Sequence, residues 1–278
     1  MLPSLYHTLQ TGASLATWVP SSNSSSVVSL YLTRASALQK AILTYQWDQS
    51  YGAFRDNATD TMLHPQDANS MAILFGVVSA TDSQAQSISS RLTENWTPIG
   101  AETPELPGNI SPFISSFEIQ AHFIAGRADR ALDLIRRCWG WYLNNPNGTQ
   151  STVIEGYLTN ATFGYRSSRG YSYDASYVSH SHGWSSGPTS ALTEYVVGLS
   201  VTEPAGRKWQ LKPQFGDLQF AQAGFTTSLG KFEAGFTVQN GSVIVNWEVP
   251  AGTEGTITLP GLKSQTVKGS KGKKVMKI

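Results

Sequence analysis

Two histidines and a tryptophan stand close together in the segment SHSHGW, residues 179–184, just ahead of a predicted helix that begins at Gly187. His180 and His182 alternate in an H-x-H pattern that can chelate a metal ion, but no third ligand follows at a matching spacing. A neutral His182 could instead share a hydrogen bond with a ligand hydroxyl, and Trp184 offers an aromatic face. The segment is therefore compatible with a ligand contact that involves no metal. The alternative is a capped helix with core histidines.

Glu155 lies in the segment TVIEGY, residues 152–157, between an isoleucine and a glycine. A carboxylate in such a partly apolar setting can act as a general base toward water. Glu155 and the histidine segment belong to one long stretch, residues 144–186, which also carries the aromatic run TFGYRSSRGYSY. A loop of this length inside a compact domain is usually functional or disordered, and its rings argue against disorder. The alternative for Glu155 is an ordinary carboxylate on a surface loop.

The composition argues against several classes of function. Charged residues make up 14% of the 278-residue chain and the net charge is +1, which indicates no nucleic-acid footprint. The single cysteine excludes a disulfide framework. No apolar run reaches the roughly 18 residues of a membrane span. Glycine-rich phosphate loops and the GxSxG pattern are missing. We therefore expect no cofactor, no metal, no nucleic-acid partner and no membrane. The 8 Trp, 11 Tyr and 11 Phe suit sugar ligands, whose C–H faces stack on rings.

Sequons of the form N-x-S/T are spread along the chain, at Asn23, Asn57, Asn95, Asn109, Asn147, Asn160 and Asn240. Their number favours a protein that passes through the secretory pathway. The first residues, MLPSLYHTLQTGASLATW, lack the basic and then apolar layout of a secretion signal. We therefore expect a secreted, glycosylated parent protein whose own start is missing from this chain.

Helical periodicity dominates the first two thirds of the chain. The predicted helices span residues 27–48, 66–74, 81–95, 112–125, 130–143 and 187–198. Thr81 and Gln84 suggest a capping box for the third, while Ser111-Pro112 and Gly126 are the expected start and stop of the fourth. Helices joined by a few residues pack antiparallel, so this part should consist of helical hairpins.

After residues 203–204 the apolar residues no longer follow a helical period but alternate with polar ones, as in β-strands. Residues 232–238 and 243–249 alternate around the turn Asn240-Gly241, and residues 256–259 predict a further strand. The lysine-rich tail, residues 268–277, reads as a solvated end. The sequence therefore predicts a mainly α chain with a C-terminal all-β domain, divided into residues 1–202 and 203–278.

Several stretches together resemble glycoside hydrolase family 78, the six-hairpin glycosidases, and in particular the C-terminal part of fungal α-L-rhamnosidase-like proteins. These stretches are TVIEGY with the aromatic loop and SHSHGWSSGPTSAL, WDQSYGAFRDN followed by LHPQDANSMAILFG, and PQFGDLQFAQAGFTTSLGKFEAGFTV. The likeness covers residues 27–260, and its most specific part combines the glutamate with HGWS-GP.

The resemblance implies both a fold and a chemistry. Family members have a ring of helical hairpins, an (α/α)6 toroid of twelve helices, with a β-sandwich that packs behind it, and they hydrolyse terminal α-L-rhamnosides with inversion. In inverting hydrolysis one carboxylic acid protonates the leaving oxygen, while a second carboxylate about 6.5–9.5 Å away activates water. Glu155 falls at the position of the water-activating base. His182, followed by Trp184, falls where a histidine contacts the bound sugar, so the expected ligand is a rhamnose-containing glycoside.

The chain departs from the family pattern at the general acid. The family places that residue in an acidic, aromatic-containing motif upstream of the matching helices, and no segment here corresponds to it. The remaining acids stand in no such motif: Asp48, Asp60, Asp67, Glu105 and Glu118. The resemblance therefore predicts a partial toroid and a truncated, poorly active α-L-rhamnosidase. The alternatives are a non-catalytic carbohydrate-binding remnant and a chain that completes its toroid only with another polypeptide.

Overall fold

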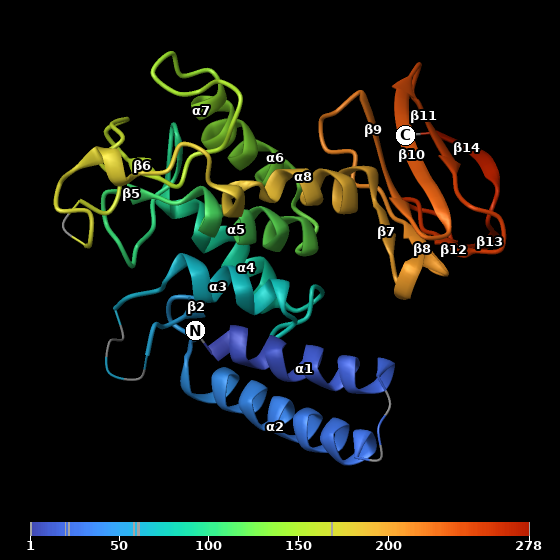
Figure 1. Ribbon diagram of the computed structural model, residues 1–278, viewed down its shortest axis with the longest axis horizontal. Helices are drawn as coiled ribbons and strands as arrows, with labels where there is room; N and C mark the ends of the chain where they lie inside the picture. The colour runs from blue at the N-terminus through green and yellow to red at the C-terminus, as the bar shows by residue number, and fades with distance from the viewer. Residues whose placement is uncertain are drawn as a thin grey trace. The chain divides into compact units, whose positions relative to one another are not determined.

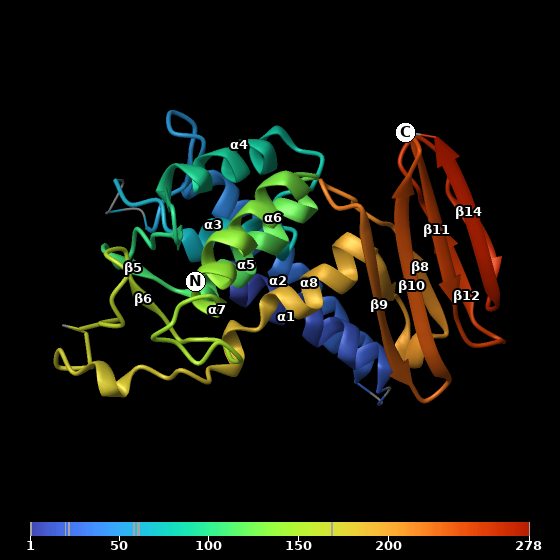
Figure 2. The ribbon, with the colours of Figure 1, turned by 90° about the horizontal axis from the view of Figure 1, so that it is seen from above.

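The computed structural model describes residues 2–19, 21, 23–57, 59, 62–167 and 169–277. The chain forms two compact units, Met1–Ser186 and Gly187–Ile278 (Figure 1, Figure 2). Helices dominate the first unit and strands the second, which confirms the predicted order of mainly α followed by β. The predicted domain boundary between residues 202 and 203 stays a prediction. No described helix is both long and apolar enough to cross a membrane.

The first unit contains helices α1 to α7 and three short strand pairs. The helices are α1 Leu2–Trp18, α2 Ser24–Tyr45, α3 Gln66–Leu74, α4 Ser83–Leu92, α5 Pro112–Ile124, α6 Ala128–Ile135 and α7 Trp141–Leu143. A π-helical turn, Arg136–Gly140, joins α6 to α7, so the predicted helix over residues 130–143 is one continuous helical segment. The core lies between these helices and includes Ile42, Phe54, Ile73, Ile88 and Leu92.

Helix α1 was not predicted, and it packs side by side with α2 as a helical hairpin (Figure 1). Its apolar residues surround the helix instead of forming a stripe: Tyr6 and Ala13 are buried, whereas Leu15 and Trp18 are 50% and 61% exposed. Because one apolar stripe is the signal that periodicity detects, such a helix leaves no clear trace in the sequence.

Two predicted helix starts had different outcomes. Ser111 caps α5 as predicted, since its Oγ accepts from the Ile114 N–H, Pro112 is the first helical residue, and Gly126 follows the helix at φ 72°. The predicted capping box of Thr81 and Gln84 is wrong. Helix α4 begins after Asp82, whose carboxylate accepts from the Ser79 N–H in the preceding turn.

Three two-residue strand pairs tie the loops of the first unit to its helices. They are β1 Trp47–Asp48 with β2 Ala53–Phe54, β3 Trp96–Thr97 with β4 Gly100–Ala101, and β5 Asn109–Ile110 with β6 Tyr157–Leu158. The β5–β6 pair anchors the long aromatic loop next to the start of α5. Short 3₁₀ turns at Ala175–Tyr177 and Gly183–Ser185 order the rest of that loop.

A polar cluster lies inside the helical core around Glu118 of α5, whose side chain is 0% exposed. The Trp96 Nε1–H and the Gln66 Nε2–H each donate to its carboxylate at 2.6 Å. His122 Nε2 lies 3.2 Å from the same carboxylate, and His122 Nδ1 lies 2.8 Å from the Ser89 hydroxyl. The cluster joins α3, α4 and α5, so its role is to hold the helices together. Buried polar groups are stable only when they are partnered in this way.

The second unit begins with α8 Gly187–Ala191 and a π-helical turn, Leu192–Val197, and continues as strands. The strands are β7 Leu199–Val201, β8 Lys208–Leu211, β9 Phe220–Thr227, β10 Gly230–Gln239, β11 Ser242–Glu248, β12 Glu254–Ile257, β13 Gln265–Lys268 and β14 Lys271–Lys277. They form two four-stranded sheets with the orders β14-β11-β10-β9 and β13-β12-β8-β7. All neighbours are antiparallel except β8 and β12, which pair in parallel.

The sequence predicted the β10–β11 hairpin correctly but misjudged the tail. Asn240 and Gly241 form its turn with φ of 50° and 68°, the left-handed conformation that Asn-Gly turns favour. The lysine-rich tail is not a solvated end, because β14 pairs along the whole of β11 as an edge strand. Lysines on an edge strand discourage pairing with other chains.

Candidate functional site

Hydrogen bonds join the glutamate segment to the histidine segment within the first unit. The Glu155 N–H donates to the Ser179 carbonyl at 2.8 Å, and the His182 N–H donates to the Val153 carbonyl at 2.8 Å. The Thr152 hydroxyl also bonds to the His180 carbonyl. Residues 152–155 and 179–182 therefore lie side by side, although more than twenty residues separate them in sequence.

Two donors hold the Glu155 carboxylate. The Tyr171 hydroxyl donates to Oε1, and the Ser179 N–H donates to Oε2 at 3.2 Å. The hydrogen bond to Glu155 raises the pKa of Tyr171, so this hydroxyl keeps its proton at neutral pH and stays a donor. The carboxylate is thus fixed at both oxygens while the residue itself remains only half-buried. The two bonds give the carboxylate a fixed orientation, and its remaining lone pairs can still accept from a water.

An open pocket of about 290 Å³ collects the predicted site residues. Its lining consists of Ser111, Phe113, Glu155, Tyr165, Arg166, His182 and Trp184. Trp184 is 72% exposed and its ring centroid lies 6.1 Å from that of Phe113. Among the described residues that line this pocket, Glu155 supplies the one carboxylate. The structure therefore brings together Glu155, His182 and Trp184, and it shows them in a pocket large enough for a monosaccharide.

Gly156 lets Tyr165 reach this pocket. A Cβ at position 156 would lie 2.4 Å from the Tyr165 ring, so a larger residue would displace it. Burial raises the pKa of Tyr165, and its side chain bonds to Ser111 at the start of α5. The ring is consequently a fixed, protonated part of the pocket wall.

The side chains of the two histidines in the H-x-H segment lie in different surroundings. His180 Nδ1 lies 2.9 Å from the Tyr142 hydroxyl, and its ring contacts Phe163 edge-on at 4.8 Å. His182 instead lines the pocket with Glu155. Within the described part of the chain, no group of three or more His, Cys, Asp or Glu side chains is placed to hold a metal ion.

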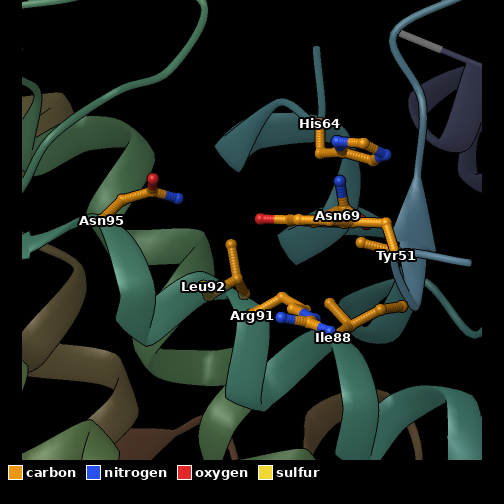
Figure 3. Close-up of a pocket in the computed structure, with 8 residues that line it drawn as sticks. Tyr51, His64, Asn69, Ile88, Arg91, Leu92 and Asn95 are labelled. Carbon is orange, nitrogen blue, oxygen red and sulfur yellow. The ribbon is translucent and has the colours of Figure 1, made fainter. Parts of the chain in front are cut away.

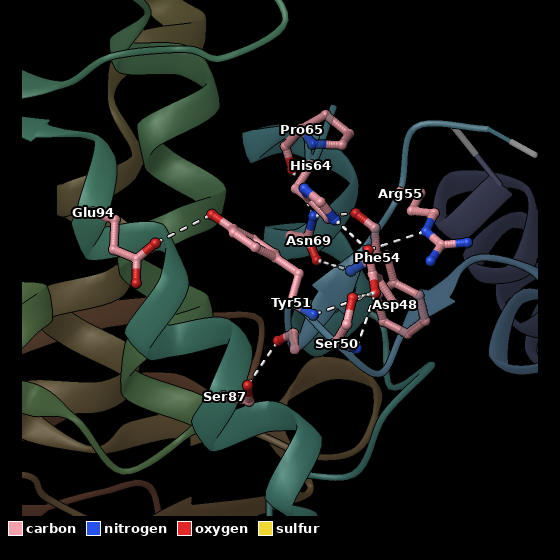
Figure 4. Close-up of polar contacts among 11 residues, drawn as sticks. Asp48, Ser50, Tyr51, Phe54, Arg55, His64, Pro65, Asn69, Ser87 and Glu94 are labelled. Carbon is pink, nitrogen blue, oxygen red and sulfur yellow. Dashed lines mark hydrogen bonds and ion pairs between the residues drawn. The ribbon is translucent and has the colours of Figure 1, made fainter. Parts of the chain in front are cut away.

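Asp48 of β1 is the centre of a separate polar cluster around the β1–β2 turn (Figure 4). Its carboxylate accepts from Arg55 Nε at 3.1 Å and from the Ser50 hydroxyl at 2.6 Å, and it lies 3.2 Å from His64 Nε2. These bonds, that of Arg55 first, hold the pKa of Asp48 well below its ordinary value. A carboxyl group that stays ionised cannot supply a proton, so Asp48 is unsuited to be a general acid.

Next to this cluster lies a small cavity (Figure 3). The Tyr51 ring is stacked on His64 at 3.8 Å between ring centroids, and the Arg91 guanidinium lies 4.7 Å from the Tyr51 centroid. The cavity measures about 10 Å³, which is too small for a sugar. This is about the volume that a single water molecule needs. The cavity is therefore a small gap in the packing around the β1–β2 turn.

Glu105 caps helix α3 from the loop that precedes β5. Its two carboxylate oxygens accept from the N–H groups of Gln66 and Asp67 at 2.9 and 3.1 Å. Burial, together with the charge of Asp67, raises the pKa of Glu105. Glu105 therefore supplies acceptors for two of the N–H groups at the start of this helix. Glu118 is buried in the core, and Asp67 and Glu105 lie at the start of α3, so none of these three residues lines the Glu155 pocket. Asp60 lies outside the described residues.

Asp48 should make the stability of the chain depend on pH. Its folded pKa is depressed below the ordinary 3.8, so it stabilises the fold above that pH, and this contribution is lost as the pH falls toward the folded pKa. We expect Asp48→Asn to lower the Tm at pH 6 and to flatten the decline in Tm between about pH 4 and pH 2. Thermal melts followed by circular dichroism measure both. Asp133→Asn, which removes a surface partner of Arg137, is the control. An unchanged slope in Asp48→Asn would contradict this assignment.

Sequence reasoning assigned six contributors no role in the site, and three of them, Ser111, Phe113 and Ser179, lie outside the aromatic run. Tyr165, Arg166 and Tyr171 all lie in the aromatic run that had been noted only as a whole. The usable signal was the density of tyrosines between the glutamate and the histidines. Which of them would meet Glu155 depends on the loop path, which local patterns do not reveal.

Comparison with known proteins gives one family match and several structural ones. Residues 198–274 match the family model described as the bacterial alpha-L-rhamnosidase C-terminal domain. No sequence among the curated proteins matches the chain.

Solved structures match nearly the whole chain. The native α-L-rhamnosidase from Aspergillus terreus is 20% identical with a TM-score of 0.71, over 98% of this chain and 29% of that one. The family 78 rhamnosidase of Bacillus sp. GL1 is 24% identical with a TM-score of 0.70, over 92% and 25%. The Streptomyces avermitilis α-L-rhamnosidase complexed with L-rhamnose is 14% identical with a TM-score of 0.71, over 99% and 26%.

These matches establish a shared fold, since all three identities are below 25%. The matching proteins come from a fungus and from bacteria, so they do not favour the predicted fungal relatives over bacterial ones. The chain spans about a quarter of the length of these proteins. Its residues 198–274 are similar to the C-terminal domain of bacterial α-L-rhamnosidases, and the chain as a whole has the fold of a corresponding portion of such enzymes.

Proposed function

We propose that this chain forms the water-activating side of an inverting glycosidase site for terminal α-L-rhamnosides, of the kind found in glycoside hydrolase family 78. The observation that carries the proposal is the pocket that unites Glu155, His182 and Trp184, with the Glu155 carboxylate held by Tyr171 and Ser179. The shared fold with α-L-rhamnosidases, one of them solved with L-rhamnose, supports the same class of ligand.

In this mechanism Glu155 is the general base. It takes a proton from a water molecule, and the water oxygen attacks the anomeric carbon from the face opposite the leaving oxygen. The leaving oxygen departs with the electron pair of the broken C–O bond and needs a proton of its own. His182 exchanges a hydrogen bond with a sugar hydroxyl, and the exposed face of Trp184 stacks on the C–H face of the ring.

The second carboxylate of an inverting pair is not assigned to this chain. The described lining of the pocket contains no carboxylate besides Glu155. General acid catalysis contributes about 10²–10⁴-fold, so poor leaving groups should be cleaved slowly by the chain on its own. Fluoride leaves without a proton, so α-L-rhamnosyl fluoride tests the base independently of the acid.

The deciding experiment compares two substrates of the purified chain. We expect hydrolysis of α-L-rhamnosyl fluoride, with β-L-rhamnose as the first product by proton NMR, and much slower release of methanol from methyl α-L-rhamnoside, whose leaving oxygen needs a proton. L-Rhamnose binding without fluoride hydrolysis would support the non-catalytic carbohydrate-binding alternative. A folded chain that neither binds L-rhamnose nor hydrolyses the fluoride would overturn the proposal.

We also propose the finer architecture of the two units. The helical hairpins α1–α2 and α5–α6 support a partial (α/α)6 toroid, and the two four-stranded sheets with buried Trp209, Phe232 and Phe236 support a β-sandwich. A crystal structure of the chain would test both. Helices that fail to pack as successive hairpins around a common axis would contradict the toroid.

We propose that the protein passes through the secretory pathway, and the sequons make this testable. Asn23, Asn147, Asn160 and Asn240 are exposed, whereas Asn109 is 7% exposed and its Nδ2 donates to the Pro107 carbonyl. Because Nδ2 is the atom that carries the glycan, a glycan on Asn109 is incompatible with this fold. Peptide mapping of folded protein secreted from a eukaryotic host should find glycans at the four exposed sites and none at Asn109. A fully unmodified secreted chain would argue against this localisation.

A further inference from the structure

A second, larger pocket adjoins the Glu155 pocket and shares Arg166 with it. It measures about 470 Å³ and lies between residues 106–109, residues 158–160 and the loop that carries Arg166, Ser167 and Arg169. Glu155 does not line it. A leaving group departs from the face of the sugar opposite the base, so a pocket beside the site but apart from Glu155 suits the group attached to the sugar.

Arg166 is held in an unusual conformation at the border of the two pockets. Its φ is 55°, a left-handed value that a non-glycine residue adopts only where its surroundings hold it there. Its N–H donates at 2.9 Å to Oδ1 of Asn109, a buried residue that in turn bonds to Pro107. The guanidinium lies 5.5 Å from the ring centroid of Tyr171, the residue that holds Glu155.

The charged residues that line the second pocket, Arg166 and Arg169, are both positive. Arg169 uses one N–H to bond the Glu105 carbonyl at 3.3 Å, and both arginines are exposed. Among the described residues, no carboxylate forms an ion pair with either guanidinium. The nearby Glu102 carboxylate is engaged by the Gly108 N–H at 2.7 Å. Two cations without a carboxylate partner in one concave site favour an anionic ligand group, and a guanidinium matches a carboxylate with two parallel hydrogen bonds.

We propose that this pocket binds the carboxylate of a uronic acid residue to which the terminal α-L-rhamnosyl residue is attached. The proposal rests on the proposed function, because it assigns the rhamnosyl residue to the neighbouring pocket. It names a substrate class, rhamnosyl uronates, in place of rhamnosides of neutral sugars or flavonoid-like aglycones.

Two non-hydrolysable disaccharides test the proposal on the intact chain. One has α-L-rhamnose joined through sulfur to the methyl glycoside of D-glucuronic acid with its carboxylate free. The other has the methyl glycoside of D-glucose in the same position, so the two differ only in carboxylate against hydroxymethyl. We expect the uronate to bind about tenfold more tightly in calorimetric titrations at low salt, with an advantage that shrinks as salt rises. Arg169→Gln should remove most of that advantage without changing L-rhamnose binding. Arg34→Gln, an exposed arginine of α2, should leave it intact.

The outcomes separate this proposal from the proposed function. Equal binding of both disaccharides, with L-rhamnose bound, would overturn the uronate assignment and leave the rhamnosidase site standing. Binding of the uronate alone, without L-rhamnose or the neutral disaccharide, would keep the anionic pocket and reject the rhamnosyl site. Failure of every ligand to bind a folded chain would reject both.

Discussion

Replacing Glu155 by glutamine should lower the hydrolysis of α-L-rhamnosyl fluoride by about 10²–10⁴-fold, the usual contribution of a general base. Glutamine has the same shape and its amide oxygen can still accept from Tyr171 or Ser179, but the amide cannot take a proton from water. The loss should therefore appear in kcat, with the KM and the Kd of L-rhamnose changed only a few-fold. Fluoride release followed with an ion-selective electrode measures kcat and KM together.

Added azide distinguishes loss of the general base from loss of structure in Glu155→Gln. Azide is already an anionic nucleophile and needs no base, so added azide should restore turnover in Glu155→Gln and yield the inverted rhamnosyl azide. Glu94→Gln, which changes a carboxylate paired with Arg91 outside the pocket, is the matched control. Loss of L-rhamnose binding together with turnover, and no rescue by azide, would mean that Glu155 supports the loop and is not the base.

Glu118→Ala should destabilise the helical unit by about 3–5 kcal/mol, the range seen when one partner of a buried polar pair is removed. The substitution leaves the Trp96 Nε1–H and the Gln66 Nε2–H without their acceptor inside the core, and each buried unpaired donor costs about 1–3 kcal/mol. Urea unfolding, followed by the helical signal in circular dichroism, measures the change.

A surface substitution provides the comparison for Glu118. Glu94→Ala removes the half-exposed pair with Arg91, and such pairs contribute about 0–1 kcal/mol. Glu118→Gln should fall between the two, because its amide keeps one acceptor oxygen. A loss below about 1 kcal/mol for Glu118→Ala would show that water or a rearranged Gln66 replaces the carboxylate.

Local sequence patterns predicted the parts of the fold that nearby residues decide. Ser111, Pro112 and Gly126 mark both ends of α5 because capping involves only the first and last turns. Asn240 and Gly241 mark the β10–β11 turn because its left-handed backbone suits those two residues. Glu155, His182 and Trp184 could be named because each stands in a short, recognisable segment. The Thr81–Gln84 box failed because Asp82 competes for the same turn.

Contacts between distant segments decided the rest, and only the tertiary structure shows them. Glu105 caps α3 across 38 residues, and Glu118 lies among partners from three separate segments. The lysine tail became a strand because β11 offered it a free edge.

The sequence by itself determined the order of helices and strands, the turn and cap residues, and the residue types available for chemistry. The tertiary structure decided that Tyr171 and Ser179 hold Glu155 and that Arg166 stands between two pockets. The physical reason is that helix caps and tight turns depend on the residues next to them. A binding pocket forms instead where a long loop folds back on itself, and its path is set by packing against the whole unit.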